Sequence, residues 1–156
     1  MEIVNKVKDI LNTIDGLKTV LYQSGFSANV TLDRKETPAA VLYLLTDFDI
    51  DIQHGTSKES AELEIFFCDR TRFDITGDQK DTIINNCTDL AKEFISKLLA
   101  EKTLYINQDS IHCKCSYGKF DTFVAGVSVE LRIEEKQGSC LYIEPEPDED
   151  NTQNEG

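Results

Sequence analysis

Hydrophobic and polar positions follow two different periods along the chain, and each period predicts one type of element. Apolar residues recur at three- and four-residue steps over residues 3–14 and again over residues 78–101, which predicts two amphipathic helices. We expect Asp15-Gly16 to end the first helix, because glycine readily adopts the left-handed conformation that is common after a helix. Residues 17–22 are interpreted as one further short turn of helix.

A period of two residues predicts strands in much of the remaining chain. From Val127 to Ile133, for example, apolar side chains alternate with polar ones, so that one face of the strand is apolar. Residues 33–38 and 54–60 are polar and predict a turn and a loop. The expected strands span residues 28–32, 41–45, 48–52, 61–68, 104–107, 111–117 and 123–134, with a short edge pairing at residues 141–143.

The order of these elements predicts the fold class. Strands occur in runs rather than in regular alternation with helices, which is typical of an α+β fold. We therefore expect an antiparallel or mixed β-sheet packed against a long central helix and an N-terminal helix. Residues 1–143 form this single domain, whereas residues 144–156 carry six acids and no lysine or arginine. Such a tail cannot bury enough apolar surface to fold alone, so we expect it to be disordered or ordered only by a partner.

Composition narrows the class of protein. The chain has 156 residues and a formal net charge of −13, which disfavours direct reading of nucleic acid because the phosphate backbone attracts basic surfaces. Its five cysteines are odd in number and irregularly spaced, as expected in a reducing compartment rather than in a disulfide-rich secreted domain. There is no apolar run of about 20 residues and no signal-peptide pattern, so we expect neither a membrane span nor secretion.

Three aspartates form the sharpest chemical candidate. Asp47, Asp49 and Asp51 alternate with apolar residues, so on a strand their carboxylates would share one face. Such a cluster could hold Mg²⁺ for phosphoryl transfer. We favour the alternative interpretation, the solvated face of a strand in a very acidic protein, because no histidine, lysine or glycine-rich loop stands nearby to complete a catalytic set.

A second candidate is the sequence His112-Cys113-Lys114-Cys115, which contains possible zinc ligands. A structural zinc site normally requires four ligands in two pairs, and Cys68, Cys87 and Cys140 stand alone. Buried cysteines acting as small hydrophobic residues are the more frequent situation.

The two histidines, His54 and His112, occur in no recognisable catalytic motif. A histidine–cysteine pair brought together by the fold stays open as an alternative. We predict a protein that is not an enzyme, with no catalytic, cofactor-binding or metal-binding residues and no cofactor.

The layout of the chain resembles a known family over residues 1–141. The features that carry the resemblance are the opening helix that ends at Asp15-Gly16, the central strands, the long helix and the stretch 121–131, where a small residue and a glycine precede alternating apolar positions. These features are similar to the tail-terminator and tail-completion proteins of tailed bacteriophages and to the related head-to-tail connector proteins.

The resemblance implies a structural virion protein with an α+β fold and no catalytic residues. Members of the family form homo-oligomeric rings, six-fold or twelve-fold, through which DNA passes without specific binding. The implied partners are other virion proteins of the portal, connector or tail, the implied location is the virion, assembled in the host cytoplasm, and no membrane is involved. An acidic channel wall would repel phosphate and let DNA slide, although the sequence assigns neither Asp47, Asp49 and Asp51 nor Glu130 and Glu134 to that wall. Ring closure would also protect edge strands such as residues 28–32.

Two other functions remain open from the sequence. The first is an acidic, monomeric binding module of the immunity or inhibitor type, which would neutralise a basic protein through its surface charge. The second is a metal-dependent phosphoryl-transfer enzyme that uses Asp47, Asp49 and Asp51.

Overall fold

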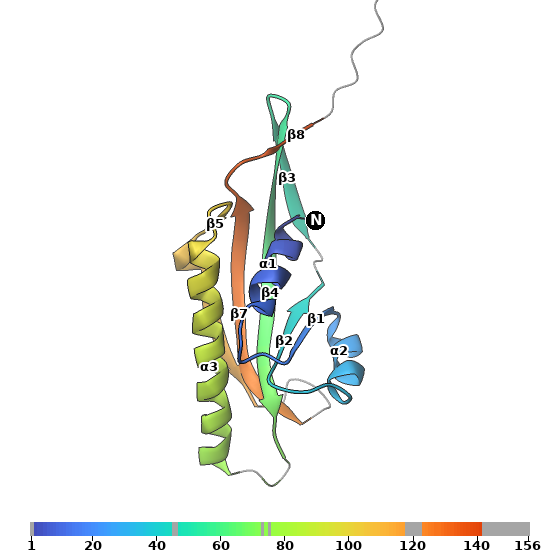
Figure 1. Ribbon diagram of the computed structural model, residues 1–156, viewed down its shortest axis with the longest axis vertical. Helices are drawn as coiled ribbons and strands as arrows, with labels where there is room; N and C mark the ends of the chain where they lie inside the picture. Colours follow the sequence, from blue (N-terminus) through green and yellow to red (C-terminus); the bar gives the residue numbers. More distant parts are fainter. Residues whose placement is uncertain (1, 45–46, 73, 75, 118–122, 142–156) are drawn as a thin grey trace, which may run out of the picture.

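Two long antiparallel strands, β4 (Thr56–Arg70) and β7 (Val124–Glu135), form the centre of the structure (Figure 1). The structure is a computed structural model that describes residues 2–44, 47–72, 74, 76–117 and 123–141. The two strands pair over eleven positions, from Ser60 opposite Glu134 to Arg70 opposite Val124. Because side chains alternate between the faces of a strand, this register places the odd-numbered residues of both strands on one face of the sheet.

Shorter strands extend the sheet on both sides of this pair. Only β1 and β2 run parallel among the paired strands of the described chain, so the sheet is mixed. The strands that flank β4 are β2 (Ala39–Tyr43), β3 (Phe48–Gln53) and β8 (Ser139–Cys140), with β1 (Thr19–Gln23) beyond β2; those that flank β7 are β5 (Leu104–Ile106) and β6 (His112–Ser116). A short 3₁₀-helix, Gln108–Ser110, joins β5 to β6.

Two helices cover the odd-numbered face of the sheet. They are α1 (Glu2–Asn12) and α3 (Gly77–Ala100), and the apolar stripe of each is buried in one core with β4 and β7. The Phe67 and Phe94 rings lie 5.8 Å apart at the centre of that core. The expected fold class, a mixed sheet packed against an N-terminal helix and a long helix, is therefore confirmed.

The limits of α3 follow from local hydrogen bonding. Thr76 caps the first turn by accepting a hydrogen bond from the backbone N–H of Gln79, and the Gln79 side chain accepts one from the backbone N–H of Thr76. At the other end of the helix, Lys97 Nζ donates to the carbonyl oxygen of Thr13 at 2.8 Å. This contact joins α3 to the residues that follow α1. The predicted helix over residues 78–101 is confirmed to within one residue at each end.

The third helix, α2 (Gly25–Leu32), shows that the predicted strand over residues 28–32 is wrong. Ser24 caps the helix, with its side chain accepting from the backbone N–H of Ser27. Ala28 and Leu32 lie four residues apart and are both buried, as expected for one side of a helix. Five alternating residues are compatible with either period, so the sequence pattern could not distinguish the two elements.

α2 covers part of the other face of the sheet. It packs on a second, smaller core made of Leu21, Ala28, Leu32, Ala39, Val41, Phe66, Cys68 and Val124. The rest of this face, along β4, β7 and β6, has no helix over it in the part of the chain that the structure describes.

The predicted helical turn over residues 17–22 is also wrong, because this segment contains β1. The strand pairs with β2 from Thr19 opposite Ala39 to Gln23 opposite Tyr43. A run of β-branched, aliphatic and aromatic residues fits the pleated surface of a sheet better than a single isolated turn of helix.

The predicted loop over residues 54–60 is reduced to a two-residue turn. His54 and Gly55 have φ values of 50° and 77°, the left-handed pair that matches the twist of a tight hairpin. Residues 56–60 continue as β4 and pair with β3. The hairpin projects beyond the ends of α1 and α3 (Figure 1), so its polar residues face solvent within a strand rather than within a loop.

The remaining predicted strands are confirmed, with small shifts of their ends. The segments 41–45, 48–52, 61–68, 104–107, 111–117 and 123–134 correspond to β2, β3, β4, β5, β6 and β7. Near the end of the described chain, β8 pairs with β4. Of the predicted edge pairing over residues 141–143, only Leu141 is described, and its N–H donates to the Gly55 carbonyl oxygen. Residues 142–143 and the predicted acidic tail, residues 144–156, lie outside the described residues.

At Gly126, the backbone of β7 lies too close to β4 for a side chain to fit between them. A Cβ atom at this position would lie 1.9 Å from the Phe67 carbonyl oxygen, whereas a Cβ atom at Gly77 would meet nothing within 4 Å. We predict that Gly126→Ala lowers the free energy of unfolding by about 3 kcal/mol, because a rigid backbone must move. Gly77→Ala, the matched control, should change it by less than about 1 kcal/mol. Urea denaturation followed by circular dichroism measures both, and equal stabilities of the two variants would contradict this account of the ladder.

Candidate functional site

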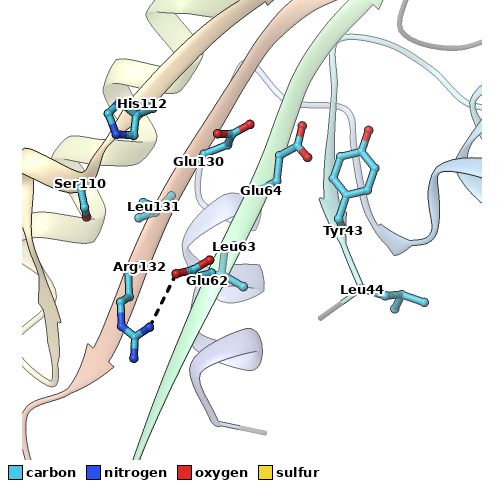
Figure 2. Close-up of a pocket in the computed structure, with 10 residues that line it drawn as sticks. All are labelled: Tyr43, Leu44, Glu62, Leu63, Glu64, Ser110, His112, Glu130, Leu131 and Arg132. Atoms are coloured by element: carbon cyan, nitrogen blue, oxygen red, sulfur yellow. Dashed lines mark ion pairs between the residues drawn. The ribbon is translucent and has the colours of Figure 1, made fainter. Parts of the chain in front are cut away.

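The uncovered face of the sheet carries a shallow hollow of about 590 Å³. Figure 2 shows carboxylates from both central strands in this hollow, Glu62 and Glu64 from β4 and Glu130 from β7, with Tyr43 on one side and His112 on the other. These side chains share the hollow because the strand registers place the even-numbered residues of β4, β6 and β7 and the odd-numbered residues of β2 on one face. The polar half of the predicted alternation along residues 123–134 is thus the floor of the site.

Arg132 organises one end of this face. Its Nη2 atom donates to Asp49 Oδ2 at 2.9 Å and to Ser60 Oγ at 2.8 Å. Its guanidinium also forms ion pairs with Glu62 at 3.7 Å and Glu134 at 3.4 Å. One cation of β7 therefore holds side chains of β3 and β4, and it offsets only part of the negative charge around it.

A second group of contacts lies near the middle of the face. Lys114 Nζ binds both carboxylate oxygens of Glu130, at 2.7 and 2.9 Å, and this hydrogen bond raises the pKa of Lys114. Ser128 Oγ donates to Glu64 Oε1 at 2.9 Å. Burial, and then the charge of Glu64, raises the pKa of Tyr43, so this phenol stays neutral at physiological pH.

The face remains acidic after these contacts are counted. By register, it holds six carboxylates and four cations among the described strand residues: Asp49, Asp51, Glu62, Glu64, Glu130 and Glu134 against Lys58, Arg70, Lys114 and Arg132. An arrangement of this kind can repel a polyanion or attract a basic protein surface.

The predicted aspartate cluster is divided among different contacts. Asp49 binds Arg132, Asp51 accepts a hydrogen bond from Gln53 Nε2 at 2.9 Å, and Asp47 precedes β3 and is exposed. Within the described ranges, no three histidine, cysteine, aspartate or glutamate side chains are placed to hold a metal ion. The geometry therefore gives the magnesium hypothesis no support.

The pleat of β6 places the side chains of residues 112–115 alternately on two faces of the sheet. His112 and Lys114 lie opposite Glu130 and Ser128 on the acidic face, whereas Cys113 and Cys115 lie opposite Val129 and Val127 on the other face. The imidazole and the two thiols therefore leave β6 on opposite sides and cannot bind one ion together. The other histidine, His54, lies in the exposed turn of the β3–β4 hairpin.

Sequence reasoning missed a second surface, the outer edge of β3. Phe48, Ile50 and Ile52 are 45%, 52% and 62% exposed, although they lie on the same side of the sheet as the main core. Within the described residues, β3 pairs with β4 alone, so its other edge is unpaired. A signal was present in the sequence, because the strand opposite, residues 56–60, contains no apolar side chain with which these three could form a core.

The chain matches no protein-family model and no curated protein. In the described part of the chain, no helix is both long enough and apolar enough to span a bilayer.

The five cysteines provide a test of the site geometry. All are free thiols; Cys68 and Cys87 are buried, whereas Cys113, Cys115 and Cys140 are exposed. Burial raises the pKa of Cys68 and of Cys87 to about 12, so their reactive thiolate form is absent near pH 8.

We predict that a disulfide reagent modifies three thiols of the native protein at pH 8 and the other two only after denaturation. Absorbance of the released thiol counts them, and Cys113→Ser should lower the native count by one. Rapid reaction of all five thiols in the native protein would contradict the buried positions of Cys68 and Cys87.

Proposed function

We propose that this protein is a structural subunit that assembles with copies of itself into a ring. In line with the resemblance in its sequence, the proposed place of the ring is the head–tail junction or the tail end of a tailed bacteriophage. The observation that carries the proposal is the outer edge of β3, which pairs with no other described strand and exposes three large apolar side chains.

An edge of this kind is unfavourable in a monomer. Unpaired backbone N–H and C=O groups next to exposed apolar side chains form a template for uncontrolled strand addition. A closed ring covers the same two patches in every copy and leaves no copy with a free edge. Self-assembly therefore accounts for a surface that the described residues leave uncovered.

A second edge offers a chemically matched partner. β6 lies on the far side of the sheet and, within the described residues, pairs only with β7. If β6 of one copy continued the sheet of a neighbour at β3, His112 and Lys114 would lie on the same face as Asp49 and Asp51. Cys113 and Cys115 would share the other face with the apolar residues of β3. The two edges differ from each other, as a ring of identical subunits requires.

The acidic face is consistent with the passage of DNA. A channel wall with excess carboxylates repels phosphate, so a duplex can move along it without being held. This part of the proposal requires that the face points towards the axis of the ring.

The same face favours one alternative, an acidic module that binds a basic protein. The carboxylates of β4 and β7 form a flat, uncovered surface, and charge complementarity would attract a basic partner to it. A protein with this function would be a monomer and would form a complex of one copy with one partner.

Oligomeric state distinguishes the two functions. We predict closed six-fold or twelve-fold particles with a central hole, seen by light scattering behind size-exclusion chromatography and by negative-stain imaging. Ile50→Lys should abolish the closed rings, because it places a charge in the apolar contact. Leu99→Lys, a matched change at an exposed position on α3, should leave the rings intact.

A wild-type protein that stays monomeric at high concentration would contradict the ring and favour the binding module. Rings that form equally well with Ile50→Lys would show that β3 is not the contact.

A further inference from the structure

A second hollow lies at the opposite end of the molecule from the β3–β4 hairpin. It has a volume of about 560 Å³ and is bounded by α2 and by the ends of β4 and β7. Its apolar lining is unusually open to solvent, since Phe26, Val30 and Phe123 are 83%, 54% and 59% exposed. An exposed apolar patch of this kind is typical of an interaction surface.

Arginine side chains surround this patch. Arg34 and Arg70 line the hollow, and Arg72 lines a neighbouring one that shares Arg70. Arg70 shapes the hollow by donating to the carbonyl oxygens of Leu32, Asp33 and Lys35 at 2.8 to 3.0 Å. Among the described residues, two acids oppose these three arginines, because Asp33 lines the hollow and Asp74 lines the neighbouring one. The surface therefore combines exposed aromatic rings with an excess of positive charge, in a protein whose net charge is −13.

The chain itself contains a segment with the complementary chemistry. After Leu141 come Tyr142 and Ile143, followed by five acids before residue 151 and no lysine or arginine. Two apolar side chains would meet the exposed rings of the hollow, and the acids would lie near its arginines. We propose that residues 142–150 of one copy bind in the hollow of another copy.

The reach of the segment explains why it binds the hollow of another copy rather than the hollow of its own molecule. Leu141 is hydrogen-bonded to Gly55, at the hairpin end of β4, whereas Arg70 ends that strand. The fourteen steps from Thr56 to Arg70 span about 46 Å at 3.3 Å per residue. Nine residues beyond Leu141, a fully extended chain reaches at most about 32 Å. Tyr142 and Ile143 reach at most about 7 Å beyond Leu141, so they cannot enter the hollow of their own molecule.

This contact joins opposite ends of two molecules, because the hollow and the hairpin lie at opposite ends of β4 (Figure 1). It is distinct from the proposed contact at β3 and requires only two copies. The test mixes two full-length variants, one with an impaired hollow and one with an impaired segment. Both carry Ile50→Lys, so that association through β3 does not contribute.

The donor chain keeps the intact segment and has an altered hollow, with Arg34→Glu and Arg72→Glu. The acceptor chain keeps the intact hollow and has a neutral segment, with Glu144→Gln, Glu146→Gln, Asp148→Asn, Glu149→Gln and Asp150→Asn. Each should be monomeric alone. Mixed in equal amounts, they should form a complex of doubled mass in sedimentation velocity, because only one functional segment and one functional hollow are present. The affinity should fall at least about tenfold between about 0.05 and 0.5 M salt, since screening weakens charge pairs.

Two controls protect the interpretation. Lys92→Glu with Lys102→Glu makes the same change of charge elsewhere, and a chain with this pair and an intact segment should still self-associate. Phe26→Ser in the acceptor chain, at a highly exposed position where folding is not at risk, should weaken the mixed complex. No complex in the mixture, or loss of self-association in the lysine control, would overturn the proposal. Neither result would bear on the ring, which is measured in chains with intact β3.

Discussion

The pairing of β4 with β7 is the constraint on which the rest of the structure depends. Every layer is placed by it: α1 and α3 pack on its odd-numbered side chains, and the acidic face consists of its even-numbered ones. A slip of the register by one residue would exchange the two sets and bury the carboxylates. Gly126 contributes to this constraint because its missing side chain lets the backbone at Phe67 come close.

The parts of the fold that were predicted are those with long, regular patterns. The helices over residues 3–14 and 78–101 and the strand over residues 123–134 each span enough residues for one period to stand out. Residues 17–22 and 28–32 were misassigned because five or six residues fit either period. There the outcome depends on contacts such as the cap at Ser24 and the ladder with β2. Residues 56–60 were predicted to form a loop because they are polar. They are polar for another reason, since that end of β4 projects beyond the helices.

The candidate site was less predictable than the fold. The alternation from Val127 to Ile133 indicated a polar face, but it did not indicate what shares that face. The ion pair between Arg132 and Asp49 joins residues 83 positions apart, and it exists because both strands flank β4. The separation of His112 from Cys113 and Cys115, in contrast, follows from the pleat of a single strand and could have been derived from the sequence once β6 was accepted.

The anchoring of Leu141 to Gly55 has a consequence for the dynamics of the molecule. The hairpin end of β4 has no apolar core of its own, so its backbone hydrogen bonds break in local openings that cost much less free energy than global unfolding. The middle of β4, from Ile65 to Cys68, is buried on both faces and opens only when the whole domain unfolds. Since Leu141 is held at the hairpin tip, any partner that binds the residues after it also restrains these openings. Binding to the residues after Leu141 would therefore slow amide exchange in β3 and in the first residues of β4, far from the helices.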